Sequence, residues 1–152
     1  MNENVSLSIR KAASKTFESL AFLEVFPKES TVETEQSGLM AVHLRVIKPF
    51  HGWLGLKTSK SFLAGVAQRL FALSASDISD EQLNDLLNEL LNTIAGSFLA
   101  TALPGDQPFS ISLPLPGLGE GNANNLNMFV WNFASEAGDF TLCGGGEIIE
   151  KL

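Results

Sequence analysis

The sequence has few of the residues that form disulfides, bind metals or act as covalent nucleophiles. Cys143 is the only cysteine among 152 residues, so an internal disulfide is impossible and the chain fits a reducing cytoplasm. No histidine lies near Cys143 in a catalytic pattern, which favours a buried structural thiol. The two histidines, His43 and His51, have no His or Cys neighbour at ligand spacing, so we expect no metal site, and His43 should be a strand side chain with a satisfied hydrogen bond.

Long hydrophobic runs and an excess of positive charge are also missing. No stretch approaches eighteen apolar residues, and residues 1–11 lack the apolar core of a signal peptide, so we expect no membrane insertion and a cytoplasmic protein. The net charge of -7 disfavours nucleic acid and anionic membranes as partners. With 45% hydrophobic residues the composition is typical of a globular protein, and we expect residues 1–152 to form a single domain.

The apolar pattern predicts helices and antiparallel strands in two similar halves. The first half is expected to contain a helix over residues 7–24, a polar connection over 28–38 and a hairpin of strands 39–47 and 53–58. A short helix to Phe71, capped by Ser59 or Ser61, then leads to a long helix over 79–102. The second half continues with a strand over 109–113, a loop over 114–125, and strands over 127–133 and 140–150. A helix followed by strands thus occurs twice. This order predicts an α+β fold, in which long helices pack on one face of an antiparallel sheet and helix plus strands form a pseudo-repeat.

Two glycine-rich segments have structural explanations. The Gly-Leu-Gly-Glu-Gly segment at 117–121 lacks the Lys-Ser/Thr of a phosphate-binding P-loop, and no predicted helix follows it. We therefore expect part of a long hairpin loop. Three glycines at 144–146 fall inside a predicted strand, where a bulge or close packing against a helix is expected rather than a ligand.

The long helix over 79–102 has well-defined ends and an apolar face. Ser79 is a good N-cap, Gln82 completes a capping box, and Pro104 with Gly105 ends the helix. The residues spaced for one buried face are Leu83, Leu86, Leu87, Leu90, Leu91, Ile94 and Phe98.

The opposite face of this helix is unusual. It carries Asn84, Asp85, Asn88, Glu89, Asn92, Thr93 and Gly96, and no Lys or Arg occurs from residue 77 to 106. Asn and Gly are poor helix formers, and the repeated carboxylates repel one another. A face that lowers helix stability in this way is typical of a surface used for a partner or for chemistry. A carboxylate metal site is disfavoured because no Glu-x-x-His accompanies it.

Within this face, Glu89 and Asn92 lie one turn apart at i, i+3 spacing. The amide of Asn92 has both a donor and an acceptor and can hold a water in a fixed orientation. The carboxylate of Glu89 can anchor a cationic group of a partner. On composition alone, a merely solvated face stays an open alternative.

Asp85-xxx-Glu89-xx-Asn92 resembles the (Asp/Ser)-xxx-Glu-xx-Asn signature of the CheC/CheX/FliY phosphatases of bacterial chemotaxis. The residues from Thr93 to Gly96 are similar to the CheX-like branch. The hairpin around Trp53, the short helix and the motif helix also follow the family's order, so the resemblance runs from about Met40 onward.

The resemblance implies removal of the phosphoryl group from the aspartyl-phosphate of a CheY-type response regulator. By analogy, Asn92 orients the attacking water in line and Glu89 contacts the Lys beside the regulator's phosphosite. The remaining partner-binding residues are then Asp85, Asn88, Thr93 and Gly96. The resemblance also implies that Mg²⁺ sits in the regulator, so that this chain has no cofactor of its own, and that the chain is a homodimer, which we expect to form through sheet edges.

The first predicted helix contains Ser14-xxx-Glu18-xx-Ala21, which looks like a degenerate copy of the motif without its asparagine. We expect this copy to be inactive, which leaves one site per chain as in CheX, whereas CheC-type members carry two. Two alternatives remain open: a regulator-binding adaptor or flagellar-switch-like module that hydrolyses nothing, and a dimeric scaffold whose polar helix faces water.

Overall fold

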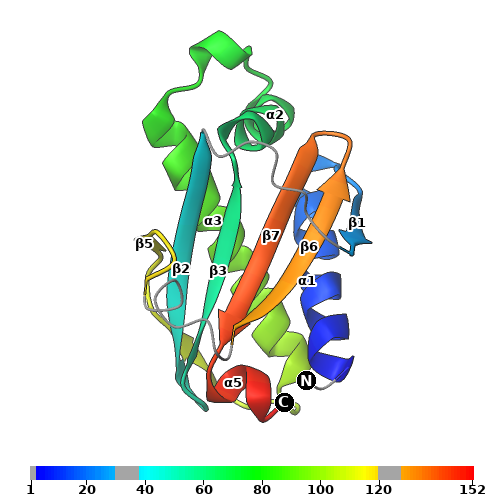
Figure 1. The fold of residues 1–152 in the computed structure, drawn as a ribbon, viewed down its shortest axis with the longest axis vertical. Helices are drawn as coiled ribbons and strands as arrows, with labels where there is room; N and C mark the ends of the chain where they lie inside the picture. The colour runs from blue at the N-terminus through cyan, green and yellow to red at the C-terminus, as the bar shows by residue number, and fades with distance from the viewer. Residues whose placement is uncertain (1–2, 30–37, 120–127) are drawn as a thin grey trace.

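The computed structural model describes residues 3–29, 38–119 and 128–152. The helices are α1 (Glu3–Ala21), α2 (Lys60–Phe71), α3 (Asp80–Ala102) and α5 (Glu147–Glu150), with a 3-10 turn η1 at Ala75–Asp77. The strands are β1 (Val25–Lys28), β2 (Leu39–Lys48), β3 (Gly52–Ser59), β4 (Ser110–Ile111), β5 (Leu115–Pro116), β6 (Phe129–Ser135) and β7 (Gly138–Gly145). The long helices α1 and α3 lie side by side behind the sheet in Figure 1, which confirms the predicted α+β arrangement.

The sheet repeats one pattern twice. Its order is β1-β6-β7-β3-β2-β4, with β5 also paired to β2, and every pairing is antiparallel. In each half a long helix is followed by a short strand and a hairpin: α1, β1 and β2–β3, then α3, β4 and β6–β7. The short strand of each half pairs with the hairpin of the other half. This exchange confirms the predicted pseudo-repeat and joins both halves in one sheet.

The core fills the space between the helices and the sheet. All seven apolar residues expected on the inner face of α3 are buried, together with Ala95 and Leu99. Rings from α1, α2, β6 and β7 meet in one cluster, in which Phe140 lies 4.6 Å from Phe17, 5.4 Å from Phe62 and 4.9 Å from Phe133 between ring centroids. The ring cluster holds α1 and α2 against the sheet, and the buried face of α3 packs into the same core, so the polar face of α3 points away from it.

Several predicted elements are observed with small shifts. The hairpin over 39–47 and 53–58 is β2–β3, and Ser59 rather than Ser61 caps α2 by accepting from the Phe62 amide at 3.0 Å. Strands predicted over 109–113 and 127–133 are found at Ser110–Ile111 and Phe129–Ser135. Parts of three predicted elements lie outside the described residues. They are residues 30–37 of the connection and residues 120–127, which belong to the loop and the start of the following strand.

Three predicted assignments are wrong. The first helix ends at Ala21 rather than at residue 24, because Phe22 adopts a left-handed backbone with φ 51° and β1 begins three residues later. The last strand ends at Gly145 rather than at residue 150, because Gly146 at φ 90° turns the chain into α5. The predicted loop over 114–125 contains β5, which pairs with His43 and Val42 of β2.

Two of the three glycines at 144–146 are explained by close packing. A Cβ on Gly144 would lie 2.9 Å from both Leu54 Cδ2 and the Trp53 carbonyl oxygen. A Cβ on Gly146 would lie 2.7 Å from the Cα of Gly52. Close packing is therefore confirmed at Gly144 and Gly146, and the neighbours at Gly146 are backbone atoms of His51 and Gly52, where β3 begins.

Gly146→Ala is expected to destabilise the fold by about 3 kcal/mol. The backbone of Gly146, with φ 90° and ψ -176°, is a conformation that alanine avoids, and the added methyl group would overlap Gly52. Urea unfolding followed by circular dichroism measures the change. Gly105→Ala is the control, because a Cβ there meets nothing within 4 Å among the described residues although its φ is also positive at 40°. An equal loss in both variants would contradict the role of close packing.

Candidate functional site

The helix α3 that carries the predicted site is fixed at its N-terminal end. The Ser79 hydroxyl accepts from the Gln82 amide at 3.1 Å, and the Gln82 side chain accepts from the Ser79 amide at 2.8 Å. This confirms the capping box. Lys60 of α2 adds an ion pair with Asp80 at 2.6 Å between exposed side chains. Because two donors at the start of α3 are satisfied, the first turn is held in place and the residues beyond it keep a defined orientation.

The predicted site residues lie together on the outer side of α3. Asp85, Glu89 and Asn92 are exposed, whereas Asn88, Thr93 and Gly96 are half-buried at the margins of this face. All six belong to one continuous helix, so their spacing along the surface is fixed by helix geometry. The structure therefore brings all six to one surface, and their roles there remain predictions.

Glu89 is oriented from within the helix. The Thr93 hydroxyl donates to Glu89 Oε1 at 3.3 Å, one turn further along. Neither Asp85 nor Glu89 takes part in an ion pair with another described residue. The carboxylate of Glu89 thus has an oriented hydroxyl neighbour and free acceptor positions for a cationic group of another molecule.

Gly96 leaves open space beside Asn92. A Cβ at this position would meet nothing within 4 Å among the described residues. No internal packing therefore requires glycine here, although glycine costs about 1 kcal/mol relative to alanine inside a helix. The absence of a side chain lowers the surface next to Asn92 and allows another backbone to approach closely.

The degenerate motif in α1 does not share this geometry. Glu18 is exposed and Ser14 half-buried, but Ala21 is only 1% exposed and belongs to the core. A residue at the position of Ala21 points inward, whereas Asn92 points outward. An asparagine introduced at position 21 would therefore not restore a second copy of the α3 site.

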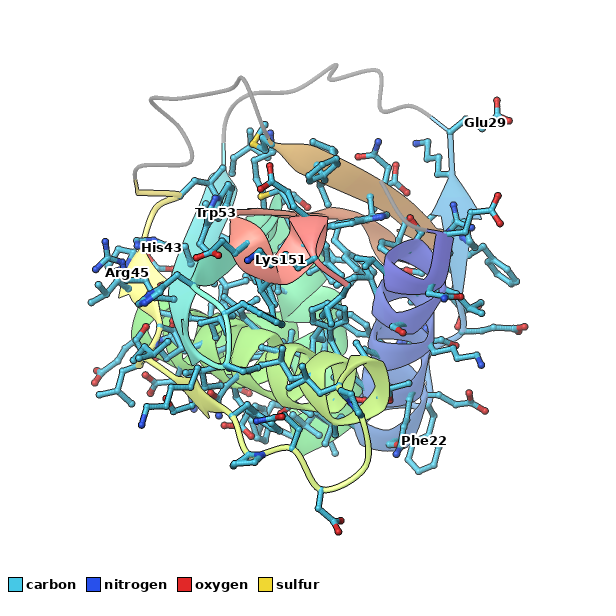
Figure 2. The ribbon with its side chains drawn as sticks, turned by 90° about the horizontal axis from the view of Figure 1, so that it is seen from below. Phe22, Glu29, His43, Arg45, Trp53 and Lys151 are labelled. Atoms are coloured by element: carbon cyan, nitrogen blue, oxygen red, sulfur yellow. The ribbon has the colours of Figure 1, made fainter. Side chains whose placement is uncertain are left out.

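A cavity of about 720 Å³ lies on another surface of the protein, where its lining includes His43, Arg45 and Trp53 (Figure 2). This is the sheet face opposite the helices, because the intervening Val42 and Leu44 are buried towards the helices and strand side chains alternate. None of the six α3 residues lines this cavity. The α3 surface is thus an exposed helix face, which suits a macromolecular partner better than an enclosed small substrate.

The remaining candidate groups have structural roles. His43 Nδ1 donates to the Gly117 carbonyl at 2.8 Å, which confirms a strand histidine with a satisfied hydrogen bond, and the Gly117 amide donates to the Ala41 carbonyl at 2.9 Å. These bonds hold the described part of the glycine-rich loop along β2.

In the described ranges, no three His, Cys, Asp or Glu side chains lie together as metal ligands. No described helix is both long enough and apolar enough to cross a membrane.

Cys143 is 3% exposed, and burial raises the pKa of its thiol to about 12 against the opposing effect of Lys57. This confirms a buried thiol.

At pH 8 the raised pKa keeps more of the Cys143 thiol protonated, so native protein is expected to react with an aromatic disulfide reagent about 1000-fold more slowly than a free cysteine. Absorbance of the released thiolate measures the rate, and urea-unfolded protein is the control. Equal rates in native and unfolded protein would contradict this account.

One exposed residue was not among those expected from the sequence. Phe22 is 85% exposed, the highest value among the large hydrophobic side chains of the described residues. It directly follows α1, within the stretch that the apolar pattern predicted to be helical. The backbone at this residue is left-handed, with φ 51°.

Comparison of the sequence with protein families finds a match to the model described as chemotaxis phosphatase CheX, over residues 41–127. This match covers more than half of the 152 residues and includes most of the β2–β3 hairpin, α2 and the whole of α3. The chain belongs to the CheX family. No curated protein sequence matches it.

Solved structures show the same fold. CheX from Desulfovibrio desulfuricans has a TM-score of 0.72 at 15% identity, with 94% of this chain and 99% of that chain covered. CheX from Vibrio vulnificus gives 0.73 at 14% identity, with 94% and 96% covered. A CheX–CheY–BeF3–Mg²⁺ complex from Borrelia burgdorferi gives 0.66 at 18% identity, with 92% and 95% covered. These likenesses confirm the CheX-like fold predicted from the sequence.

Proposed function

We propose that this CheX-family chain is a phosphatase acting on the aspartyl-phosphate of a CheY-type response regulator. The observation that carries the proposal is the pair Glu89 and Asn92, adjacent on an outer helix face whose only charges are carboxylates. The family match extends across this helix, and one family structure contains CheX together with CheY. Both findings support a regulator as the partner of α3.

In the proposed reaction, the Asn92 amide orients one water in line with the phosphorus atom of the regulator. The water oxygen bonds to phosphorus, the bond from phosphorus to the aspartyl oxygen breaks, and the products are inorganic phosphate and the free carboxylate. Phosphoryl transfer of this kind depends mainly on positioning and electrostatic stabilisation, so a correctly placed amide can act as the catalytic group without a covalent step. Asn92 supplies a donor and an acceptor for this purpose.

Glu89 is proposed to anchor the regulator by binding the lysine beside its phosphosite. Thr93 orients this carboxylate through its hydroxyl. The flanking residues proposed to contact the regulator are Asp85, Asn88, Thr93 and Gly96. The open space beside Gly96 supports a close approach of the partner backbone to Asn92.

The divalent cation is proposed to belong to the regulator, so that this chain brings no cofactor. The complex from Borrelia burgdorferi contains Mg²⁺ and BeF3 together with CheX and CheY. We further propose a cytoplasmic homodimer of single-domain chains, each with one site. The outer edges at β1 and at β4 and β5 have unpaired backbone groups among the described strands and are the candidate dimer contacts.

A binding assay and a decay assay on the same regulator distinguish an enzyme from an adaptor. We expect the chain to bind a CheY-type receiver domain from the same organism more tightly when the receiver is activated with beryllofluoride and Mg²⁺. We also expect it to shorten the lifetime of the phosphorylated receiver. Binding without faster decay would favour the adaptor, and neither effect would favour the scaffold.

A further inference from the structure

Phe22 combines two unfavourable features, an exposed aromatic ring and a left-handed backbone. Its ring is 85% exposed, and its backbone lies in the left-handed region at φ 51°. Its amide donates to the Glu18 carbonyl and the Leu23 amide donates to the Phe17 carbonyl, both at 3.2 Å. This is the bonding pattern of a helix that ends in a left-handed residue, a position where glycine or asparagine is favoured. A bulky, water-exposed aromatic residue at this position indicates a role outside the folded chain.

The position of Phe22 relative to the site follows from the packing of α1 against α3. The two helices lie side by side and run in opposite directions (Figure 1). A furrow between them, the α1–α3 furrow, is lined by Lys11, Ser14, Lys15, Glu18, Ser19, Ser97 and Thr101. Lys15 and Glu18 of α1 therefore lie beside Ser97 of α3. One turn further along both helices, Phe22, directly after α1, is level with Thr93, and Glu89 lies one turn beyond Thr93.

The side of α3 that faces this furrow also carries the anchor of the proposed site. Glu89, Thr93, Ser97 and Thr101 follow one another at i, i+4 and so form one row along the helix. The last two line the furrow, and the hydrogen bond from Thr93 to Glu89 continues the row. The furrow thus leads from Thr101 towards Glu89, and Phe22 stands on its α1 side at the Glu89 end.

The Phe22 ring lies on the helix side of the molecule, away from the sheet. Figure 2 shows Phe22 on the side of the helix layer, projecting away from the protein, whereas Glu29 beyond β1 lies towards the opposite side of the molecule. Glu89 and Asn92 are also exposed on the outer side of the helix layer, because the opposite face of α3 is buried against α1 and the sheet.

We propose that Phe22 is the apolar anchor of the regulator-docking surface, which then spans α1 as well as α3. The proposal rests on the proposed function. The occupant is the receiver domain bound at Glu89, because a body large enough to bring a phosphosite to Asn92 extends over the adjacent helix. An exposed aromatic ring that becomes buried against a partner, beside polar contacts, commonly contributes much of the binding energy. A second copy paired through the β1 edge would extend the sheet, whereas the ring projects from the helix layer.

Phe22→Asn tests the anchor while keeping the helix end intact. Asparagine accepts a left-handed backbone better than phenylalanine does, so the melting temperature is expected to be equal or higher by about 2–4 °C. The Kd for a receiver domain activated with beryllofluoride and Mg²⁺ is expected to rise about tenfold. Turnover of phosphorylated receiver should show a higher KM with nearly unchanged kcat. Leu113→Asn is the matched control, because Leu113 is 83% exposed but follows β4, and it should leave the Kd unchanged.

The outcomes separate the anchor from the phosphatase. If Phe22→Asn binds the activated receiver as tightly as the parent chain, or weakens self-association instead, the anchor proposal is wrong. If Phe22→Asn weakens binding while Asn92→Ala leaves decay unchanged, the anchor stands and the phosphatase proposal fails. If the parent chain does not bind the activated receiver at all, both proposals fail.

Discussion

Asn92→Ala is expected to slow hydrolysis of the phosphorylated regulator by at least about 100-fold, because a water that loses its orienting amide is seldom in line with the phosphorus. The side chain is exposed, and among the described residues it makes no hydrogen bond that the substitution would break. Folding should therefore be unaffected, or slightly favoured by the higher helix propensity of alanine. The measurement is loss of radiolabelled phosphate from the regulator at saturating concentrations.

The matched control is Asn84→Ala, the same change on the same exposed face two turns earlier. It is expected to retain the turnover of the parent chain. The affinity of Asn92→Ala for the beryllofluoride-activated receiver should stay within about twofold of the parent, because a group that acts on the water contributes mainly to the transition state. Similar losses in both variants, or a large loss of affinity with Asn92→Ala, would assign Asn92 to binding rather than to catalysis.

Glu89→Lys is expected to weaken binding of the activated receiver by about 100-fold, because it places a positive charge against the lysine beside the phosphosite. The substitution also removes the acceptor of the Thr93 hydroxyl, but this contact lies on an exposed helix surface. The fold should remain stable, since lysine and glutamate have similar helix propensities. Isothermal titration calorimetry measures the Kd.

Glu150→Lys makes the same change in net charge on α5, which lies at the end of the molecule opposite the start of α3, and serves as the control (Figure 1). If the effect of Glu89→Lys is local, Glu150→Lys should bind as the parent chain does. If both variants lose affinity equally and raised salt abolishes the difference from the parent, general charge rather than a specific contact governs binding.

The long helix could be predicted from sequence because its signals are local. The capping residues Ser79 and Gln82 act within one turn, and the leucine spacing is set by helix geometry alone. The order of helices and hairpins also followed from local patterns. The exchange of β1 and β4 between the two halves could not be predicted, because each is very short and is held by pairing with a distant hairpin.

The wrong boundaries share one physical cause, which is backbone geometry decided by tertiary contacts. Phe22 lies between buried Ala21 and buried Leu23 in sequence, so the apolar pattern continues while the helix has already ended. Ile148 and Ile149 are β-branched and predict a strand, but both are buried from α5. In both places the change of direction occurs at a positive φ, for which the sequence gives only a weak signal at Gly146 and none at Phe22.

The six α3 residues of the candidate site could be grouped from sequence because they share one helix. What the sequence could not show is which other element borders that helix. The α1–α3 furrow forms where α1 packs beside α3, and Ala21 at the end of α1 is buried in the core. A site that spans two helices therefore required the structure, whereas a site on one helix did not.

The central claim is that this chain is a catalyst with Asn92 as its water-orienting residue. The most direct test follows the decay of a phosphorylated CheY-type receiver domain with the chain present at about one-hundredth of the receiver concentration. The account predicts that the parent chain accelerates decay over many turnovers and that Asn92→Ala leaves the receiver at its intrinsic rate. Decay that the parent chain does not accelerate, or accelerates no more than Asn92→Ala does, would contradict the claim.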